Sequence, residues 1–230
     1  MGAKQQLVAL SLWAVCSAST LAAQGSRVAL VPHGGFALGY NLAEDVDYSF
    51  DLQPAAYFGV SVDLTLTKVF GLTLGALRSV GQPSVGELRL SLRDSVTGAA
   101  ALAQTMVSGA LVIRPGGRRP TGAPTPLYIE AGGGLNFWTF GNFVIAREQG
   151  LVAFLGEDFN ANKPFGYGAV GFTLPVGPRA QLNIYARANY ITEYSSRGLD
   201  DFNNAEPPAR TVKGKAGPSF MAGIGMRVGR

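Results

Sequence analysis

The chain has 230 residues and a formal net charge of +4, and only 15% of its residues are charged. A charge this small and scattered gives no indication of nucleic-acid binding, and the length fits one domain. Hydrophobic residues make up 47% of the chain, yet no segment approaches the roughly 20 continuous apolar residues that a membrane-spanning helix needs. β-Structure is therefore the remaining way to accommodate so much apolar surface.

The first 23 residues have the layout of a secretory signal peptide. Lys4 is the only early charge, an apolar run extends from Leu7 to Cys16, and small residues fill Ser17–Ala23. The run is too short to span a bilayer as a helix, so we expect residues 1–23 to be cleaved and residues 24–230 to form the mature domain. Cys16 is the only cysteine, so the exported domain must be held by packing or by a membrane rather than by disulfides.

Apolar and polar residues alternate with period two in segment after segment of the mature part. From Gln53 to Thr67 the even positions are apolar while the odd positions are mostly polar or small, and the same pattern recurs in Ala180–Ile191 and Phe220–Val228. Strands of this kind are predicted near 30–41, 53–66, 70–79, 104–114, 127–139, 164–175, 180–192 and 218–229. Eight is an even number, as a closed up-and-down barrel made from one chain requires.

The connections between these strands alternate in length. Three are short: Thr67–Val69, Pro115–Pro126 and Val176–Arg179. Four are long: Leu42–Leu52, Val80–Ala103, Phe140–Lys163 and Glu193–Gly217. Thirteen of the 15 acidic residues fall in the long connections. Short turns at one end, long loops at the other and a band with little charge between them are typical of transmembrane β-barrels.

A further alternating stretch, Glu87–Arg93, lies inside the third predicted connection. A ninth membrane strand would make the strand count odd, and the barrel would not close from one chain in the usual way. We therefore predict that this stretch extends the neighbouring hairpin above the membrane.

Four charged residues lie on the polar parity of the predicted strands: Asp63, Glu130, Arg187 and Arg227. Amides on the same parity lie nearby: Asn136, Gln181, Asn183 and Asn189. The interior of an eight-stranded barrel is just wide enough for side chains to fill it, and buried charges there need partners. The pattern predicts an ionic network that packs the barrel interior, which argues against a general porin.

Two partial sequence motifs, one for a dinucleotide cofactor and one for calcium, lack other features that such sites need. Gly166, Gly168 and Gly171 match G-x-G-x-x-G, but no crossover helix follows them, so we interpret them as strand glycines beside bulky aromatics. Asp158, Asn160 and Asn162 begin a calcium-loop pattern that Lys163 and Ala169 break. Weak binding of a divalent cation by these residues remains an open alternative. Acidic residues of the first loop are the other candidates: Glu44, Asp45, Asp47 and Asp51. No cofactor is indicated.

His33 is the only histidine, so any hydrolase or acyltransferase that uses an imidazole base would have to use it. Its parity points inward, and its same-face neighbours Val31 and Gly35 offer no nucleophile. We therefore expect no enzyme activity and no catalytic residue. Aromatic residues gather towards strand ends, and those that point outwards suit interfacial girdles: Tyr40, Phe70, Tyr128, Phe137, Trp138, Phe140, Phe165 and Tyr190.

Three features together have a known counterpart: the signal peptide, the eight alternating segments and the Gly-rich last strand Phe220–Val228. In these features the chain resembles the small outer-membrane β-barrel superfamily typified by the OmpA transmembrane domain and OmpX-like proteins. The resemblance implies residence in the outer membrane, contact with its lipid, and insertion by the outer-membrane assembly machinery, which recognises the last strand. It brings no catalytic motif.

The sequence thus favours a non-enzymatic outer-membrane barrel with a role in structural support or in surface recognition or adhesion, with a possible extracellular ligand held by the long loops. Three alternatives stay open. They are a small channel or transporter for ions or small solutes, a soluble periplasmic ligand-binding barrel whose apolar face lines a pocket, and a membrane-embedded lipid-modifying enzyme that would use His33.

Overall fold

The computed structural model describes residues 28–45, 48–79, 82–89, 95–116, 126–147, 150–177, 180–200 and 213–228. The predicted signal peptide, residues 1–23, lies outside this part of the chain. No helix in the described ranges is long and apolar enough to cross a membrane. Nearly all of the regular structure is antiparallel β-sheet.

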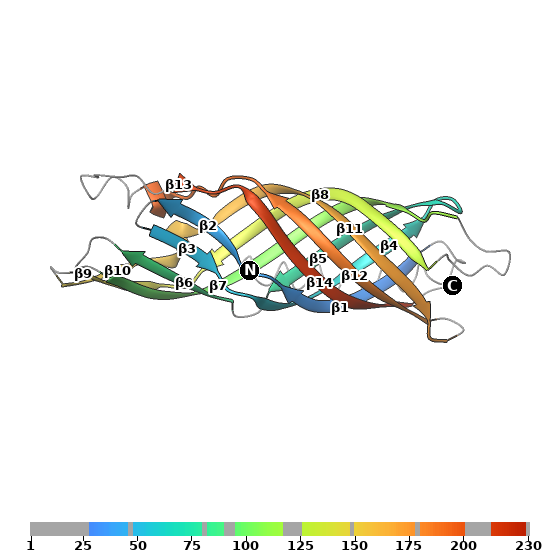
Figure 1. Ribbon diagram of the computed structural model, residues 1–230, viewed down its shortest axis with the longest axis horizontal. Coiled ribbons are helices and arrows are strands. Elements are labelled where there is room, and N and C mark those ends of the chain that lie inside the picture. The colour runs from blue at the N-terminus through green and yellow to red at the C-terminus, as the bar shows by residue number, and fades with distance from the viewer. Residues whose placement is uncertain are drawn as a thin grey trace, which may run out of the picture.

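Eight strands close into one barrel (Figure 1). They are β1 (Val28–Ala37), β4 (Ala55–Thr65), β5 (Phe70–Ser79), β7 (Ser95–Ile113), β8 (Leu127–Phe140), β11 (Ala161–Pro175), β12 (Ala180–Ile191) and β14 (Gly217–Val228). Each pairs with the next in this order, and β14 pairs back with β1, from Leu30 opposite Val228 to Ala37 opposite Met221. The predicted eight-stranded antiparallel barrel is confirmed.

Six further strands lie at one end of the barrel, to the left in Figure 1. They are β2 (Tyr40–Asp45), β3 (Tyr48–Leu52), β6 (Gln82–Arg89), β9 (Phe143–Arg147), β10 (Gly150–Phe154) and β13 (Lys213–Gly214). All of them come from segments predicted as long connections or from their margins. At the opposite end the described chain only turns, as between Thr65 and Phe70.

The β6–β7 ladder carries the barrel hairpin well beyond the barrel itself. It runs from Gln82 opposite Leu102 to Arg89 opposite Ser95, and β3 and β2 add to its outer side. The interpretation of Glu87–Arg93 as an extended hairpin therefore holds for Glu87–Arg89, while residues 90–93 lie outside the described ranges.

Buried and exposed side chains alternate along the barrel strands, with the apolar face outside as in membrane barrels. Large apolar side chains point outward and stay exposed, among them Phe36 at 67%, Phe58 at 54% and Ile224 at 57%. Residues of the opposite parity fill the interior, such as Val31 at 3% and Asp63 at 7%. The apolar face is outside, so it does not line a pocket, and this arrangement argues against the soluble ligand-binding barrel.

Two inward glycines make room for ring systems in the narrow interior. A Cβ at Gly171 would overlap the Tyr128 ring, and a Cβ at Gly223 would collide with the Tyr57 hydroxyl and lie 3.0 Å from the Tyr185 hydroxyl. Gly166 and Gly168 face outwards, and a Cβ at either position would make only an ordinary contact with a backbone oxygen, at 3.8 and 3.9 Å respectively. The glycines of the G-x-G-x-x-G match are therefore strand residues, as predicted, and Gly171 is the one packed against an aromatic ring.

The outward parity gives a direct test of the lipid belt. Ile224→Lys places a charge midway along β14, where we expect a loss of roughly 2–4 kcal/mol in the free energy of unfolding. Val228→Lys puts the same charge on the same face at the end of the strand, where the loss should be roughly 0–1 kcal/mol. Urea unfolding in lipid vesicles measures both, and equal losses would contradict a belt centred on Ile224.

Candidate functional site

The polar interior of the barrel is the candidate site, and an ion pair lies near its short-turn end. Asp63 on β4 and Arg227 on β14 face each other across β1, with 3.4 Å between Arg227 Nη1 and Asp63 Oδ2. Thr73 Oγ1 donates a 2.5 Å hydrogen bond to Asp63 Oδ1, and Arg227 Nη2 donates to Thr65 Oγ1 at 3.4 Å. Both carboxylate oxygens therefore have partners, as a buried charge requires.

Arg187 on β12 finds partners other than a carboxylate. Its Nε donates to Asn189 Oδ1 at 2.6 Å, and its guanidinium carbon lies 3.6 Å from the centre of the Tyr167 ring and 5.4 Å from that of Phe165. Cation–π contact of this kind stabilises a desolvated guanidinium. Glu130 faces the same cavity and hydrogen-bonds to the side chain of Tyr167.

The four charges predicted to face the interior do so, but the structure joins them in two separate ways. Asp63 and Arg227 form a direct ion pair. Within the described strands no direct ion pair links Glu130 to Arg187, and Tyr167 contacts both of them instead. Of the nearby amides, Asn183 accepts from Thr173 Oγ1 at 3.0 Å.

A chain of aromatic polar groups crosses the middle of the interior. Tyr57 Oη donates to Tyr185 Oη at 2.8 Å, and Tyr185 Oη lies 3.1 Å from His33 Nδ1. Among these three residues only His33 was singled out from the sequence, and neither tyrosine was predicted. Their inward parity, shared with Asp63 and Arg187, is the signal that could have identified them.

A small cavity of about 40 Å³ lies among these groups inside the barrel. Its walls include His33, Ser61, Asp63, Glu130 and Arg187. A space of this size accommodates about three water molecules. It is far too small for an acyl chain or a peptide, although Ser61, His33 and Asp63 all line it.

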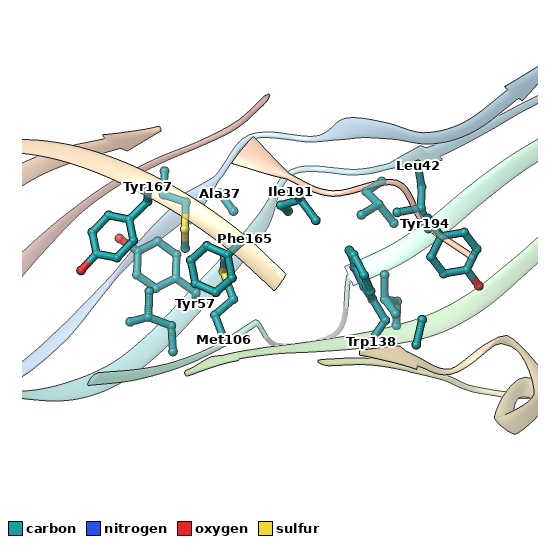
Figure 2. Packing of buried hydrophobic residues seen from close by; sticks show 14 of the residues in the cluster. Ala37, Leu42, Tyr57, Met106, Trp138, Phe165, Tyr167, Ile191 and Tyr194 are labelled. Atoms are coloured by element: carbon teal, nitrogen blue, oxygen red, sulfur yellow. The ribbon is translucent and has the colours of Figure 1, made fainter. Parts of the chain in front are cut away.

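Beyond this polar region, towards the extra strands, buried apolar side chains pack together (Figure 2). We call this group the apolar plug: Leu42, Leu52, Leu102, Trp138, Phe140, Ile191 and Tyr194. All are at most 5% exposed. Leu42 and Leu52 come from β2 and β3, and Tyr194 follows β12, so segments outside the barrel strands contribute to this group.

Hydrogen bonds hold the rim of the plug. Tyr194 Oη donates to the Phe159 carbonyl at 2.6 Å and lies 2.9 Å from Ser196 Oγ, and its ring meets Trp138 edge-on at 5.7 Å between centroids. Burial raises the pKa of Tyr194, with the Ser196 hydrogen bond acting in the opposite direction, so its phenol stays protonated at neutral pH.

The aromatic residues expected in interfacial girdles divide into two groups. Phe70 and Tyr190 point outwards, at 44% and 59% exposure, and Phe137 has the same outward parity. Four others point inward and pack the interior instead: Tyr128, Trp138, Phe140 and Phe165. The Tyr40 side chain lies outside the described side chains.

The calcium-loop residues serve the backbone near the 3-10 helix η1 (Gly156–Phe159). Asn160 Oδ1 accepts from the Phe140 backbone at 2.8 Å, and the Asp158 backbone donates to the Leu155 carbonyl at 3.2 Å. Among the described residues no group of three or more His, Cys, Asp or Glu could hold a metal ion. In the first loop, Asp47 and the side chains of Glu44, Asp45 and Asp51 lie outside the described part.

Comparison with known proteins identifies the fold. No family model and no curated protein matches the chain. The outer membrane protein OprG from Pseudomonas aeruginosa matches with a TM-score of 0.50 and 14% identity, over 90% of this chain and 99% of OprG. Ail, the attachment invasion locus protein of Yersinia pestis, matches with a TM-score of 0.48 and 11% identity, over 88% of this chain and 99% of Ail. At this level of identity, the likeness to OprG shows a shared fold.

A double-mutant cycle measures the ion pair. Asp63→Asn keeps the shape of the side chain but leaves Arg227 without its counter-charge, so we expect a loss of roughly 3–5 kcal/mol in the free energy of unfolding. Adding Arg227→Gln should restore part of this loss, because no uncompensated charge then remains in the interior. Urea unfolding in vesicles, monitored by gel mobility, measures the free energy of unfolding of each variant in the cycle. Strict additivity of the two single changes would show that the pair does not act as one unit.

Proposed function

We propose that this chain, an eight-stranded β-barrel with the fold of the small outer-membrane proteins, seals its own interior and displays an ordered β-sheet at the cell surface for recognition or adhesion. Lipid is its first partner, since the exposed side chains of the barrel wall are apolar. We also infer that the outer-membrane assembly machinery inserts it through β14, which carries the alternating pattern of a last strand.

The interior supports packing rather than transport or catalysis. We propose that Asp63, Glu130, Arg187 and Arg227 act together as an ionic network that fixes the strands around a small hydrated cavity. The Asp63–Arg227 pair and the shared position of Glu130 and Arg187 on the cavity wall support this role. The apolar plug adds a second barrier towards the extra strands.

The observation that carries the recognition role is the β-ladder beyond the barrel. β6 and β7 continue to pair up to Arg89 and Ser95, and β3, β2 and β13 widen the same sheet. An ordered sheet loses less conformational entropy on binding than flexible loops of equal length. A protein with only a structural role in the membrane would not need such an extension.

The channel and enzyme alternatives each lack a structural element that they need. A channel needs a continuous wet path, whereas seven apolar side chains form the plug. A lipid-modifying enzyme needs its base at a rim, whereas His33 is hydrogen-bonded to Tyr185 on the wall of a cavity too small for an acyl chain. We therefore propose a non-enzymatic role.

Shortening the extension tests recognition. Joining Ser79 to Leu102 by a short Gly/Asn turn removes β6 and the upper half of β7 while leaving the barrel pairing of β5 and β7 in place. We expect cells that produce this variant to lose most of their adherence to a panel of immobilised glycans and extracellular-matrix proteins, compared with cells that produce the unaltered chain.

The matched control puts the same short turn in place of residues 117–125, which connect Ile113 at the end of β7 to Leu127 at the start of β8. It should leave adherence unchanged, and both variants should keep the heat-dependent gel mobility of a folded barrel. Undiminished adherence after removal of β6 would overturn the recognition role. Steady single-channel currents from the unaltered protein in planar bilayers would overturn the sealed interior and favour the small channel.

A further inference from the structure

Arg78 is the one charged residue among the described outward positions of the barrel wall. All the other described residues at outward positions of the eight barrel strands are apolar, small, or polar without charge. Arg78 follows this outward parity on β5, between the buried Leu77 and Ser79, and it is exposed. A charge on the lipid face is costly at the centre of a membrane, so its position along the barrel is informative.

Arg78 lies near the end of β5 that leads to the extra strands. It is eight residues from Phe70, the outward aromatic at the short-turn end of the same strand. At about 3.3 Å per residue and a strand tilt near 40°, this separation corresponds to a rise of roughly 20 Å, against a belt roughly 25 Å tall. The guanidinium therefore lies at the level where hydrocarbon gives way to lipid headgroups, where an outward arginine carries little penalty.

Neighbouring strands hold Arg78 against the wall. Arg78 is paired with Thr105 on β7 and with Phe58 on β4. Its Nη1 donates to Thr105 Oγ1 at 3.3 Å. A guanidinium has five N–H donors, and this bond uses one of them. No acidic side chain in the described part of the chain forms an ion pair with Arg78.

Polar outward side chains continue from Arg78 along one side of this rim. Thr105 on β7, Thr139 on β8 and Asn162 on β11 all share the outward parity, and Thr139 and Asn162 are exposed. The outward Phe137 lies in register between Thr105 and Asn162, so one aromatic ring interrupts this polar row. The rim positions on the other side are apolar or aromatic, such as Leu38 at 57% and Tyr190 at 59% exposure. One arc of the wall thus offers hydrogen-bond donors at headgroup depth.

We propose that Arg78, positioned by Thr105, binds the phosphate of a lipid in the leaflet on the side of the extra strands. The planar fork of a guanidinium matches two phosphate oxygens, and the apolar wall below it accommodates the acyl chains of the same molecule. A lipid is the source of the phosphate because the site opens onto the membrane rather than onto the interior. This inference rests on the proposed membrane orientation.

Lipid retention tests the site directly. The purified barrel is reconstituted in phosphatidylcholine bilayers that contain a minor fraction of diphosphorylated lipid A, and the lipid A that stays bound after mild detergent extraction is counted by native mass spectrometry. We expect Arg78→Gln to retain about tenfold less, because a hydrogen-bonded ion pair with phosphate is lost. Arg78→Lys, which keeps the charge but not the fork, should fall between the two.

Lys68→Gln is the matched control. Lys68 is exposed in the turn between β4 and β5 at the opposite rim, so the change removes the same charge from the other end of the barrel. It should retain as much lipid A as the unaltered chain, and inorganic phosphate offered to the protein in uncharged detergent should not bind. Equal retention by Arg78→Gln and the unaltered chain, or an equal loss in Lys68→Gln, would overturn the site.

Heat-dependent gel mobility separates this result from a failure to fold. Surface protease cleavage of intact cells separates it from a wrong orientation. If cleavage shows that the extra strands are on the periplasmic side, the proposed function is wrong, but the position of Arg78 on the outer face of the barrel is unaffected. If cleavage places them outside and retention is unchanged, the lipid site alone fails.

Discussion

The structure depends on one constraint: within hydrocarbon, every backbone N–H and C=O needs a partner inside the protein. The β1–β14 pairing meets it, because it joins the last strand to the first and leaves no open edge in the barrel. Period-two alternation then assigns each side chain to lipid or to the interior. The exposed Phe36 and Ile224 and the buried Val31 and Asp63 are consequences of this single closure.

Closure with eight strands also determines what the interior can be. It leaves room for side chains and for little else. Tyr57 and Tyr185 fit because Gly223 has no Cβ, and Tyr128 fits because of Gly171. In such a space a polar group needs a partner, so Asp63 binds both Thr73 and Arg227, while Arg187 stacks on Tyr167. The interior is thereby a core with polar and apolar layers.

The sequence predicted the barrel because each membrane strand carries its own local signal. The predicted 70–79 and the observed β5 coincide, and the other barrel strands agree within a few residues apart from the start of β7. Inward parity likewise placed Asp63 and Arg227 correctly, but their pairing depends on the register of β14, β1 and β4, which no single strand encodes. The plug was missed because Leu42 and Leu52 come from connections, where period-two alternation does not indicate which way a side chain points.

The even positions of β14 face lipid and the odd positions face the interior, and the rest of the barrel depends on this division. Single cysteines at 219 through 226, each carrying a nitroxide label in the reconstituted barrel, measure it through collision with a lipid-soluble relaxation agent. We expect strong collision at Phe220, Ala222 and Ile224 and weak collision at Met221, Gly223 and Gly225, repeating every second residue. A uniform profile, or collision with a water-soluble agent at the even positions, would contradict it.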